Sequence, residues 1–445
     1  MTSLTPLEPW IKTKIGLPTA EPLTRSILEE YQLRKLRETI EHARLHSPFY
    51  RQQLDGCGNP SSLAELTLLP FTFPPDLQAD DLRFLCVSRR EIERVVTLAS
   101  SGTTAPAKRL HFTAEDLELT EDFFHHGMAT LVDPGERALI LMPGELPGSV
   151  GELLVKGLAR MDVEGIVHWP VGDPEEVIAE IVERRISSLV GLPWQLLALV
   201  RHPAASLLPT GRIRSCLLSA DYVAKAVVGE IGRIWGCPVF NHYGMTEMGL
   251  GGGVDCRSLS GYHLREADLY FEIVDPVDGQ PLPDGESGEV VFTTLTRRGM
   301  PLIRYRTGDL AAFLPHPCPC GTVLRRLGHV RGRLSGRVAV ADGLWLDCAD
   351  LDETLYPITG LVNYKAEMLE KKGRDTLALT LYMWDTAEEA AHGARTALEQ
   401  IPALGAAFSL GNFDLEVILL SSGKQPVMGV AKKTILDLRS GGTKK

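Results

Sequence analysis

The chain has 445 residues, of which 44% are hydrophobic and 23% are charged, and its formal net charge is -11 at pH 7. This composition is typical of a globular protein with two or three domains, and the acidic balance argues against nucleic acid or an acidic membrane as a partner of the whole surface. No apolar run reaches the ~18 residues of a membrane-spanning helix, and the first residues lack the apolar core of a secretory signal. Eight irregularly spaced cysteines favour buried thiols or a metal site over a disulfide scaffold, so we expect a cytoplasmic protein.

The first 90 residues are predicted to form a helical lead-in. Residues 26–50 carry apolar side chains near helical spacing, and Ser47 followed by Pro48 predicts the end of that helix. From about residue 95, short β-rich runs alternate with helical ones. Thr113 and Asp116 form a capping signal for a helix that reaches about Leu131. The predicted strands are residues 94–98, 109–112, 137–143, 165–169, 187–193, 213–219 and 238–244, and the predicted later helices are 151–161, 174–186, 194–202 and 223–235.

This alternation predicts an α/β fold whose largely parallel sheet is covered by helices on both faces. After about residue 249 the pattern changes to strands joined by turn-rich loops, which predicts a smaller antiparallel β unit. The last ~110 residues are long enough for a small α+β domain of their own.

The segment "LASSGTTAPAKRLHFT", residues 98–113, lies between two apolar runs and is suited to holding an anion. Its glycine permits the backbone amides to converge on an oxyanion, while its hydroxyls donate hydrogen bonds and its lysine supplies a mobile charge for a polyphosphate. The residues concerned are Ser100, Ser101, Gly102, Thr103, Thr104 and Lys108. The alternative is a solvated turn between two strands.

The segment "NHYGMTEMG" follows an apolar strand end, where ligands bind in open α/β sheets. Tyr243 offers a flat ring, Gly244 a turn, Thr246 a hydroxyl and Glu247 a carboxylate that suits Mg²⁺ beside phosphates. The alternative is that Glu247 is a surface acid near a turn.

In "PLIRYRTGDL", Asp309 follows a Thr-Gly turn and could accept hydrogen bonds from both hydroxyls of a ribose. For an isolated Asp in such a turn, a salt bridge within the β-turn is the alternative.

Together, and in this order, the three segments resemble the adenylate-forming superfamily of acyl-CoA synthetases, adenylation domains and luciferases. "SSGTTAPAK" departs from the family's phosphate loop at residues 105–107, whereas the Y-G-x-T-E and R-Y-R-T-G-D segments are intact. "LIRYRTGDL" followed by "CPCG" is most similar to the phenylacetate–CoA ligase branch. The resemblance covers about residues 90–335 and implies a large N-terminal domain, 1–333, with a β subunit and a small mobile C-terminal α+β domain, 334–445.

The resemblance also implies roles for individual residues. The loop hydroxyls and Lys108 would hold the ATP β- and γ-phosphates, Thr246 and Glu247 the α-phosphate and Mg²⁺, and Asp309 the ribose. Tyr243 would stack near the adenine, and Arg333 would lie beside the ribose at the domain junction. "LLSADY" stands in place of the family's adenine segment, which makes Ser219, Ala220 and Asp221 weaker candidates.

A fourth group is independent of the nucleotide. Cys256 and His263 are separated by six residues, and Cys318 and Cys320 lie in a C-P-C-G turn. Two thiolates on a tight turn and a Cys/His pair suit a closed tetrahedral Zn²⁺ site, and the phenylacetate–CoA ligase branch shows similar positions. The alternative is that the four are small buried groups. A structural ion that holds the β unit to the core is expected, and the remaining cysteines are expected to be packing residues.

Two segments depart from the family's pattern. The hinge after G-R has residues 334–336, Leu-Ser-Gly, where the family usually has an acid. The C-terminal lysine that reaches the acyl phosphate is expected at Lys432, counted back from the final Leu-Arg. Lys424 and Lys433 are alternatives, and all three could equally be solvated surface residues.

We therefore expect an ATP-dependent, AMP-forming acyl- or aryl-CoA ligase, in which a carboxylate attacks the α-phosphate and the CoA thiol then displaces AMP. Positioning and charge neutralisation would dominate this chemistry. The expected cofactors and partners are ATP, Mg²⁺, CoA, a structural Zn²⁺ ion, a small carboxylic acid and, in a homodimer, a second copy of the chain.

Two rival hypotheses remain at this level. One is an adenylate-forming enzyme with an acceptor other than CoA, which the altered hinge allows, and the other is a degenerate nucleotide-binding regulatory relative. The acid itself is not readable: the segments expected near it include His125 and His126, and this histidine pair is typical of ordinary packing.

Overall fold

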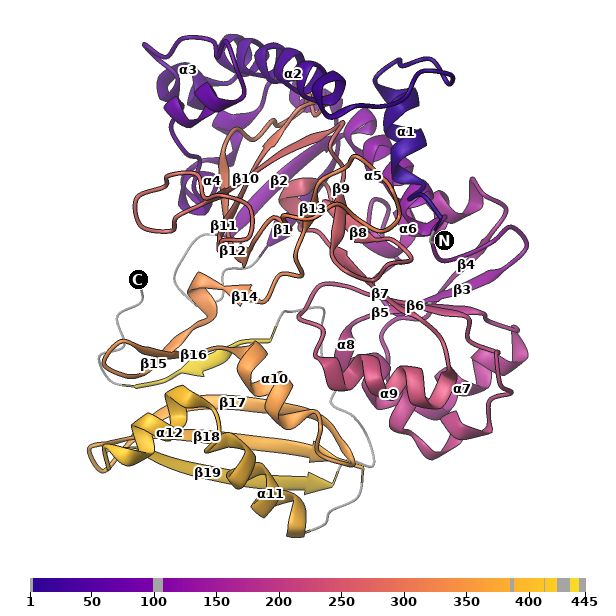
Figure 1. Cartoon of the computed structure of the whole chain (residues 1–445), viewed down its shortest axis with the longest axis vertical. Coiled ribbons are helices and arrows are strands. Elements are labelled where there is room, and N and C mark those ends of the chain that lie inside the picture. The colour runs from indigo at the N-terminus through magenta and orange to yellow at the C-terminus, as the bar shows by residue number, and fades with distance from the viewer. Residues whose placement is uncertain (1–2, 99–106, 385–387, 412, 422–432, 440–445) are drawn as a thin grey trace. The chain divides into compact units, whose positions relative to one another are not determined.

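The computed structural model describes residues 3–98, 107–384, 388–411, 413–421 and 433–439 (Figure 1). The chain divides into two compact units. Unit 1 comprises Met1–Gly135, Pro143–Gly165 and Phe240–Val330, and unit 2 comprises Glu136–Met142, Ile166–Val239 and Arg331–Lys445. Each unit is therefore assembled from segments that are separated in the sequence.

Unit 1 begins with the predicted helical lead-in, which consists of α1 (Leu7–Lys14), α2 (Arg25–His46), α3 (Pro48–Gln53) and α4 (Pro74–Ala79). The Thr24 side chain accepts a hydrogen bond from the Ile27 amide and caps α2. Ser47 ends this helix and caps the next, because its hydroxyl accepts from the Tyr50 amide at 3.2 Å. The predicted helix end at Ser47-Pro48 is thus confirmed.

The phosphate-loop segment lies between two paired strands of unit 1. Strands β1 (Ile92–Leu98) and β2 (Lys108–Thr113) are antiparallel, and α5 (Ala114–Met128) follows directly. Thr113 and Asp116 form the predicted capping box, with two reciprocal hydrogen bonds of 3.1 Å. The helix ends three residues before the predicted Leu131. It packs closely on α6 (Val150–Ala159) at Gly157, where an added Cβ would meet the α5 backbone at 3.0 Å.

Two antiparallel groups of strands form the β part of unit 1, as predicted. One group runs in the order β13-β9-β8-β7 and the other includes β10-β11-β12. Their bounds are β7 (Val239–Tyr243), β8 (Gly253–Asp255), β9 (Tyr262–Leu264), β10 (Leu269–Val274), β11 (Gly288–Thr294), β12 (Tyr305–Ala311) and β13 (Arg326–Leu327). Aromatic side chains of the second group, Phe271, Phe292 and Tyr305, belong to the core of the unit.

The first part of unit 2 has the predicted βα alternation. Strands β3, β5 and β6 are parallel neighbours, and three helices join or follow them. The bounds are β3 (Arg137–Ile140), β4 (Glu164–Val167), α7 (Pro174–Glu183), β5 (Ser188–Gly191), α8 (Pro193–Arg201), β6 (Ser215–Leu218) and α9 (Lys225–Trp235). The hydrophobic periodicity alone was sufficient to predict these elements.

The rest of unit 2 is an α+β segment, also as predicted. Its largest sheet has the order β19-β18-β17-β20, and a separate pair joins β15 and β16. The bounds are β14 (Gly332–Arg333), β15 (Val338–Ala341), β16 (Leu344–Leu346), α10 (Cys348–Leu355), β17 (Leu361–Lys371), β18 (Arg374–Met383), α11 (Glu388–Leu398), α12 (Pro402–Ser409), β19 (Phe413–Ser421) and β20 (Ile435–Asp437).

This segment shares a hydrophobic core with the α/β part of unit 2. From α8, the Arg201 guanidinium donates to the Tyr356 carbonyl at 2.7 Å and to the Ile358 carbonyl at 3.1 Å. The boundary between residues 333 and 334 stays a prediction. Among the described residues, no helix combines the length and the apolar character needed to cross a membrane.

Candidate active site

Three polar side chains from separate segments of unit 1 meet at the start of β2. The Lys108 ammonium forms an ion pair with Glu247 Oε1 and lies 3.3 Å from the Tyr305 hydroxyl. That hydroxyl donates to the same Glu247 oxygen at 3.2 Å. The Glu247 side chain is 3% exposed and that of Lys108 is 15% exposed. A carboxylate this deeply buried requires a compensating cation, which the lysine supplies.

The backbone around Glu247 is fixed by close contacts. An added Cβ at Gly244 would meet the Leu250 carbonyl oxygen at 2.1 Å, so this position accepts no side chain. The buried Arg297 guanidinium donates to the Glu247 carbonyl at 2.9 Å and to the His111 carbonyl at 3.1 Å. Burial lowers the pKa of Arg297 below its usual value, although the nearby Asp116 and Glu247 oppose the shift. Glu247 is therefore held from both its side chain and its main chain.

A second polar pair joins the Y-G-x-T-E segment to the T-G-D turn. The Tyr243 hydroxyl donates to Asp309 Oδ2 at 2.9 Å, and Asp309 is fully buried. The turn before it is fixed by Glu289, whose Oε1 accepts from the Gly308 amide at 2.9 Å while Oε2 accepts from Arg306 Nε at 2.8 Å. Gly308 has φ +76°, a conformation that favours glycine. The two arginines of the motif thus serve the fold, since Arg304 pairs with the buried Glu272 at 3.0 Å.

The predicted adenine segment lies in unit 2, directly after β6. Ala220 has φ +70°, which is uncommon for a residue with a Cβ atom. Asp221 Oδ1 accepts from the Tyr222 amide at 2.9 Å. Ser219 and Arg333 also belong to unit 2, the latter in the two-residue strand β14.

A buried lysine near the C-terminus has carboxylate and phenol partners. Lys433 Nζ lies 2.7 Å from Asp352 Oδ1 and hydrogen-bonds the Tyr356 hydroxyl, and its amide donates to Asp221 Oδ2 at 3.4 Å. Burial raises the pKa of Asp352 to about 6, although the positive charge of Lys433 opposes the shift. Lys433 therefore serves the interior of unit 2, whereas the predicted catalytic Lys432 lies outside the described residues, as do Ser100, Ser101, Gly102, Thr103 and Thr104.

The four predicted zinc ligands converge in unit 1. Cys256 follows β8, His263 lies in β9, and Cys318 and Cys320 lie between β12 and β13. All four are buried, and their ligand atoms lie within 4.8 Å of one another. The sulfurs of Cys256 and Cys318 are 3.6 Å apart, and Cys320 Sγ is 3.5 Å from His263 Nε2. These separations match a tetrahedral ion with bonds of about 2.3 Å to sulfur and about 2.0 Å to nitrogen, which places ligand atoms ~3.5–3.8 Å apart.

The fold is that of the adenylate-forming acyl-CoA ligases. A solved structure of 2-hydroxyisobutyryl-CoA ligase in complex with 2-HIB-AMP aligns with a TM-score of 0.77 and 19% sequence identity, covering 95% of this chain and 94% of that one. A benzoate CoA ligase from Burkholderia xenovorans LB400 aligns with a TM-score of 0.54 and 14% identity, over 74% of this chain and 65% of that one. The predicted fold class is thereby confirmed.

Residues 94–295 match the family described as AMP-binding enzyme. The phenylacetate-coenzyme A ligase of Thermus thermophilus is 30% identical over 340 residues, which are 71% of this chain and 72% of that protein. The phenylacetate-coenzyme A ligase of Escherichia coli K12 is 28% identical over 401 residues, 86% of this chain and 89% of that protein. The chain therefore belongs to the family of AMP-binding enzymes that includes these ligases.

Sequence reasoning did not single out several residues that build this site. Tyr305 was read as part of the R-Y-R-T-G-D motif without a role, and Arg297 and Glu289 were not considered. Strand alternation was a usable signal for Tyr305, because β12 places it on the face opposite Arg306. The contact of Arg297 with a carbonyl 50 residues away has no local signature.

Proposed function

We propose that this enzyme is an AMP-forming carboxylate–CoA ligase, which activates a carboxylic acid with ATP and transfers the acyl group to CoA. The observation that carries the proposal is the buried Glu247 carboxylate with its Lys108 partner, in a chain of the family that includes phenylacetate–CoA ligases. An aryl or arylalkyl acid is the substrate class that the named relatives favour.

In this proposal, each polar group of the site acts on one part of the nucleotide or of the acyl-adenylate. Lys108 and the loop hydroxyls hold the β- and γ-phosphates, and Asp309 accepts from the ribose hydroxyls. Thr246 orients the α-phosphate, while the Tyr243 ring borders the adenine and its hydroxyl keeps Asp309 in place. Lys432 neutralises charge on the acyl phosphate. The acceleration of the reaction comes from positioning of the reactants and from fixed charges in a site that largely excludes water.

Glu247 suits Mg²⁺, because an ionised carboxylate is the hard oxygen donor that this cation takes beside phosphates. When bound, Mg²⁺ supplies positive charge to the triphosphate. Tyr305 keeps Glu247 Oε1 oriented through its hydrogen bond. Lys108 exchanges its carboxylate partner for phosphate oxygens when the nucleotide binds.

The four-residue Cys/His cluster is proposed to hold a structural zinc ion. The donor set is complete, so the ion would have no open position for substrate. It would join the loop after β8 to the loop before β13 and would act as a structural cross-link between them. The cluster therefore stabilises the β part of unit 1 and takes no part in acyl transfer.

The second candidate is an adenylate-forming enzyme with another acceptor. It is favoured by residues 334–336, where Leu-Ser-Gly forms a short 3₁₀ turn without an acidic side chain. If the hinge cannot adopt the thioester-forming geometry, the acyl-adenylate is formed and passes to a different nucleophile.

A panel experiment distinguishes these functions. The purified chain is incubated with ATP, Mg²⁺ and each of phenylacetate, benzoate, 2-hydroxyisobutyrate and acetate, and ATP–pyrophosphate exchange is measured with and without CoA. The ligase proposal expects exchange with at least one acid and a CoA thioester by mass spectrometry. Exchange without thioester supports another acceptor, and the absence of exchange with every acid contradicts both functions.

A further inference from the structure

A polar cluster on helix α5 shares no residue with the proposed nucleotide-binding residues or with the four-residue Cys/His cluster. Asp122, His125 and His126 occupy positions i, i+3 and i+4, which share one face of a helix. Their ligand atoms lie within 4.8 Å of one another. The two imidazole rings stack with centroids 4.2 Å apart and planes at 23°, and His126 Nε2 is 3.5 Å from Asp122 Oδ1.

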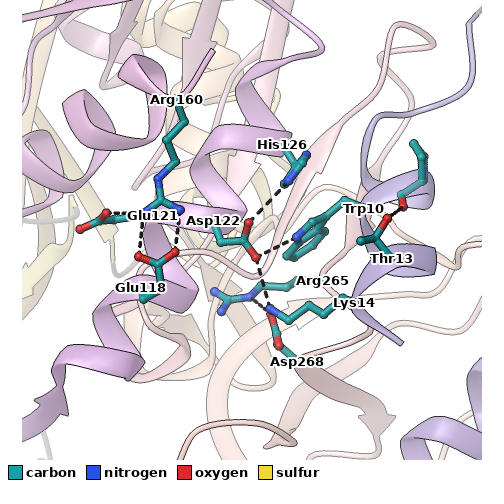
Figure 2. A network of polar contacts seen from close by, with 11 residues as sticks. Trp10, Thr13, Lys14, Glu118, Glu121, Asp122, His126, Arg160, Arg265 and Asp268 are labelled. Carbon is teal, nitrogen blue, oxygen red and sulfur yellow. Dashed lines mark hydrogen bonds and ion pairs between the residues drawn. The ribbon is translucent and has the colours of Figure 1, made fainter. Parts of the chain in front are cut away.

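The two oxygens of Asp122 have different surroundings (Figure 2). Oδ2 accepts from the Trp10 indole N–H at 2.8 Å and lies 3.5 Å from the Lys14 ammonium. Oδ1 faces His126, and no other contact of Oδ1 is described within hydrogen-bond distance. Carboxylates that bind metals are held in this way, with one oxygen fixed by an outer hydrogen bond and the other directed at the ion.

The nearby positive charge is largely compensated. Lys14 pairs more closely with Asp268, at 2.7 Å, than with Asp122. Arg160 is turned toward Glu118 and Glu121, with ion-pair distances of 2.6 Å to each. An added cation at Asp122 Oδ1 therefore faces no unpaired ammonium or guanidinium among the described side chains drawn in Figure 2.

We propose that Asp122, His125 and His126 form a second metal site, which binds one divalent transition-metal ion such as Zn²⁺ or Ni²⁺. Two imidazoles and one carboxylate are the borderline donors that these ions take, and they leave at least one coordination position for water. The side chains of Asp122 and His126 are 29% and 28% exposed, so the ion has access from solvent. Because the nitrogen lone pairs lie in the ring planes, the two imidazoles would rotate out of their stack to direct one nitrogen each at a common ion.

The site is connected to the N-terminal helix α1. Trp10 stacks on His126 with ring centroids 5.4 Å apart, in addition to its hydrogen bond to Asp122. A bound ion would fix both partners of Trp10, so metal binding should stabilise the docking of α1 on α5. The same contact gives an optical signal, because Ni²⁺ next to an indole quenches its fluorescence.

The test uses the full-length chain and Ni²⁺ as the probe. Isothermal titration with NiCl₂ is compared among the wild type, His126→Ala, the double variant His125→Ala/His126→Ala and Asp122→Asn. Wild type should bind one ion more than the double variant, and each single change should weaken binding at least ~10-fold. Asp122→Asn keeps an acceptor for Trp10, so its loss of binding is not a loss of helix docking.

His46→Ala is the matched control, because His42 and His46 form another neighbouring pair of imidazole rings on a helix, with centroids 4.9 Å apart and ring planes tilted by 50°. Its Ni²⁺ binding should equal that of wild type, and Trp10→Phe should keep the ion while losing the fluorescence quenching. Circular dichroism checks that each variant is folded. Equal binding by wild type and the folded double variant, or binding lost equally in His46→Ala, would overturn the proposal.

Discussion

Replacing Glu247 by Gln is the most informative single change, because it separates the two roles of this carboxylate. In the fold, Glu247 compensates the charge of Lys108, and in the proposed reaction it binds the metal of Mg·ATP. Glutamine keeps the volume and can still accept from Tyr305, so the change removes charge and little else.

The size of the expected loss of unfolding free energy follows from the burial of the Lys108–Glu247 ion pair. With side chains only 3% and 15% exposed, the two charges are poorly solvated, and removal of one leaves an uncompensated charge. Breaking such a pair costs about 3 kcal/mol or more, and the partial exposure of Lys108 places the expected loss of unfolding free energy at about 2–3 kcal/mol. Loss of a group that stabilises developing charge should lower ATP–pyrophosphate exchange ~10²–10³-fold.

The matched variant is Lys108→Met/Glu247→Gln, in which neither charge remains. Urea denaturation should show that it regains most of the lost stability, because no buried charge is left unpaired. Exchange activity should stay low, since both phosphate and metal contacts are gone. The reasoning fails if Glu247→Gln is as stable as wild type, or if the double variant recovers exchange together with stability.

Four further changes test separate parts of the structure. Lys433→Met should lower the free energy of unfolding by about 3 kcal/mol because Asp352 is left buried without its cation, whereas Lys432→Ala should lower adenylation at least ~10²-fold with little change in stability. Cys318→Ser should remove about one zinc ion per chain, measured by elemental analysis, and lower the melting temperature by several degrees. Burial lowers the pKa of His242 to about 4, so the folded state holds a neutral ring where the unfolded chain begins to bind a proton near pH 6.5. The contribution of the neutral His242 ring to the free energy of unfolding is therefore complete above about pH 6.5 and falls by about 2 kcal/mol between pH 7 and pH 5. In urea denaturation at a series of pH values, His242→Phe should reduce this slope.

Each of these has a control and a contrary outcome. Lys433→Met with normal stability but no activity would make Lys433, and not Lys432, the reacting lysine. Cys57→Ser is the control for zinc, since this cysteine lies outside the cluster, and unchanged zinc content in Cys318→Ser would refute the cluster's role. For the pH effect, the control is His316→Phe, at a histidine whose described hydrogen bond is made by its main-chain carbonyl. An unchanged slope in His242→Phe would show that another group carries the pH dependence.

The sequence alone was enough to predict the order of elements, because the signals for them are local. The capping box of Thr113 and Asp116, the Ser47-Pro48 helix end and the 3.6-residue periodicity of the helices depend on neighbours within a few positions. The three nucleotide motifs were also visible as short patterns, and their order along the chain identified the family that the comparisons then showed.

The tertiary structure decided which residues share a site. Lys108 and Glu247 are 139 residues apart, and Tyr243 and Asp309 are 66 apart, yet each pair is in contact. Spacing in the sequence carries no information about such contacts, because they depend on how strands from different segments are placed in one unit. Cys256, His263, Cys318 and Cys320 were predicted as one group from their residue types, and the fold decides the distances between their ligand atoms.

The histidine pair of α5 shows the difference most clearly. From the sequence, His125 and His126 were typical of ordinary packing, because two adjacent histidines have no ligand spacing of their own. The folded chain places Asp122 one turn away with one oxygen held by Trp10, a residue 112 positions earlier. Helix geometry brings three donors to one face, but only the packing of α1 on α5 fixes the direction of the carboxylate.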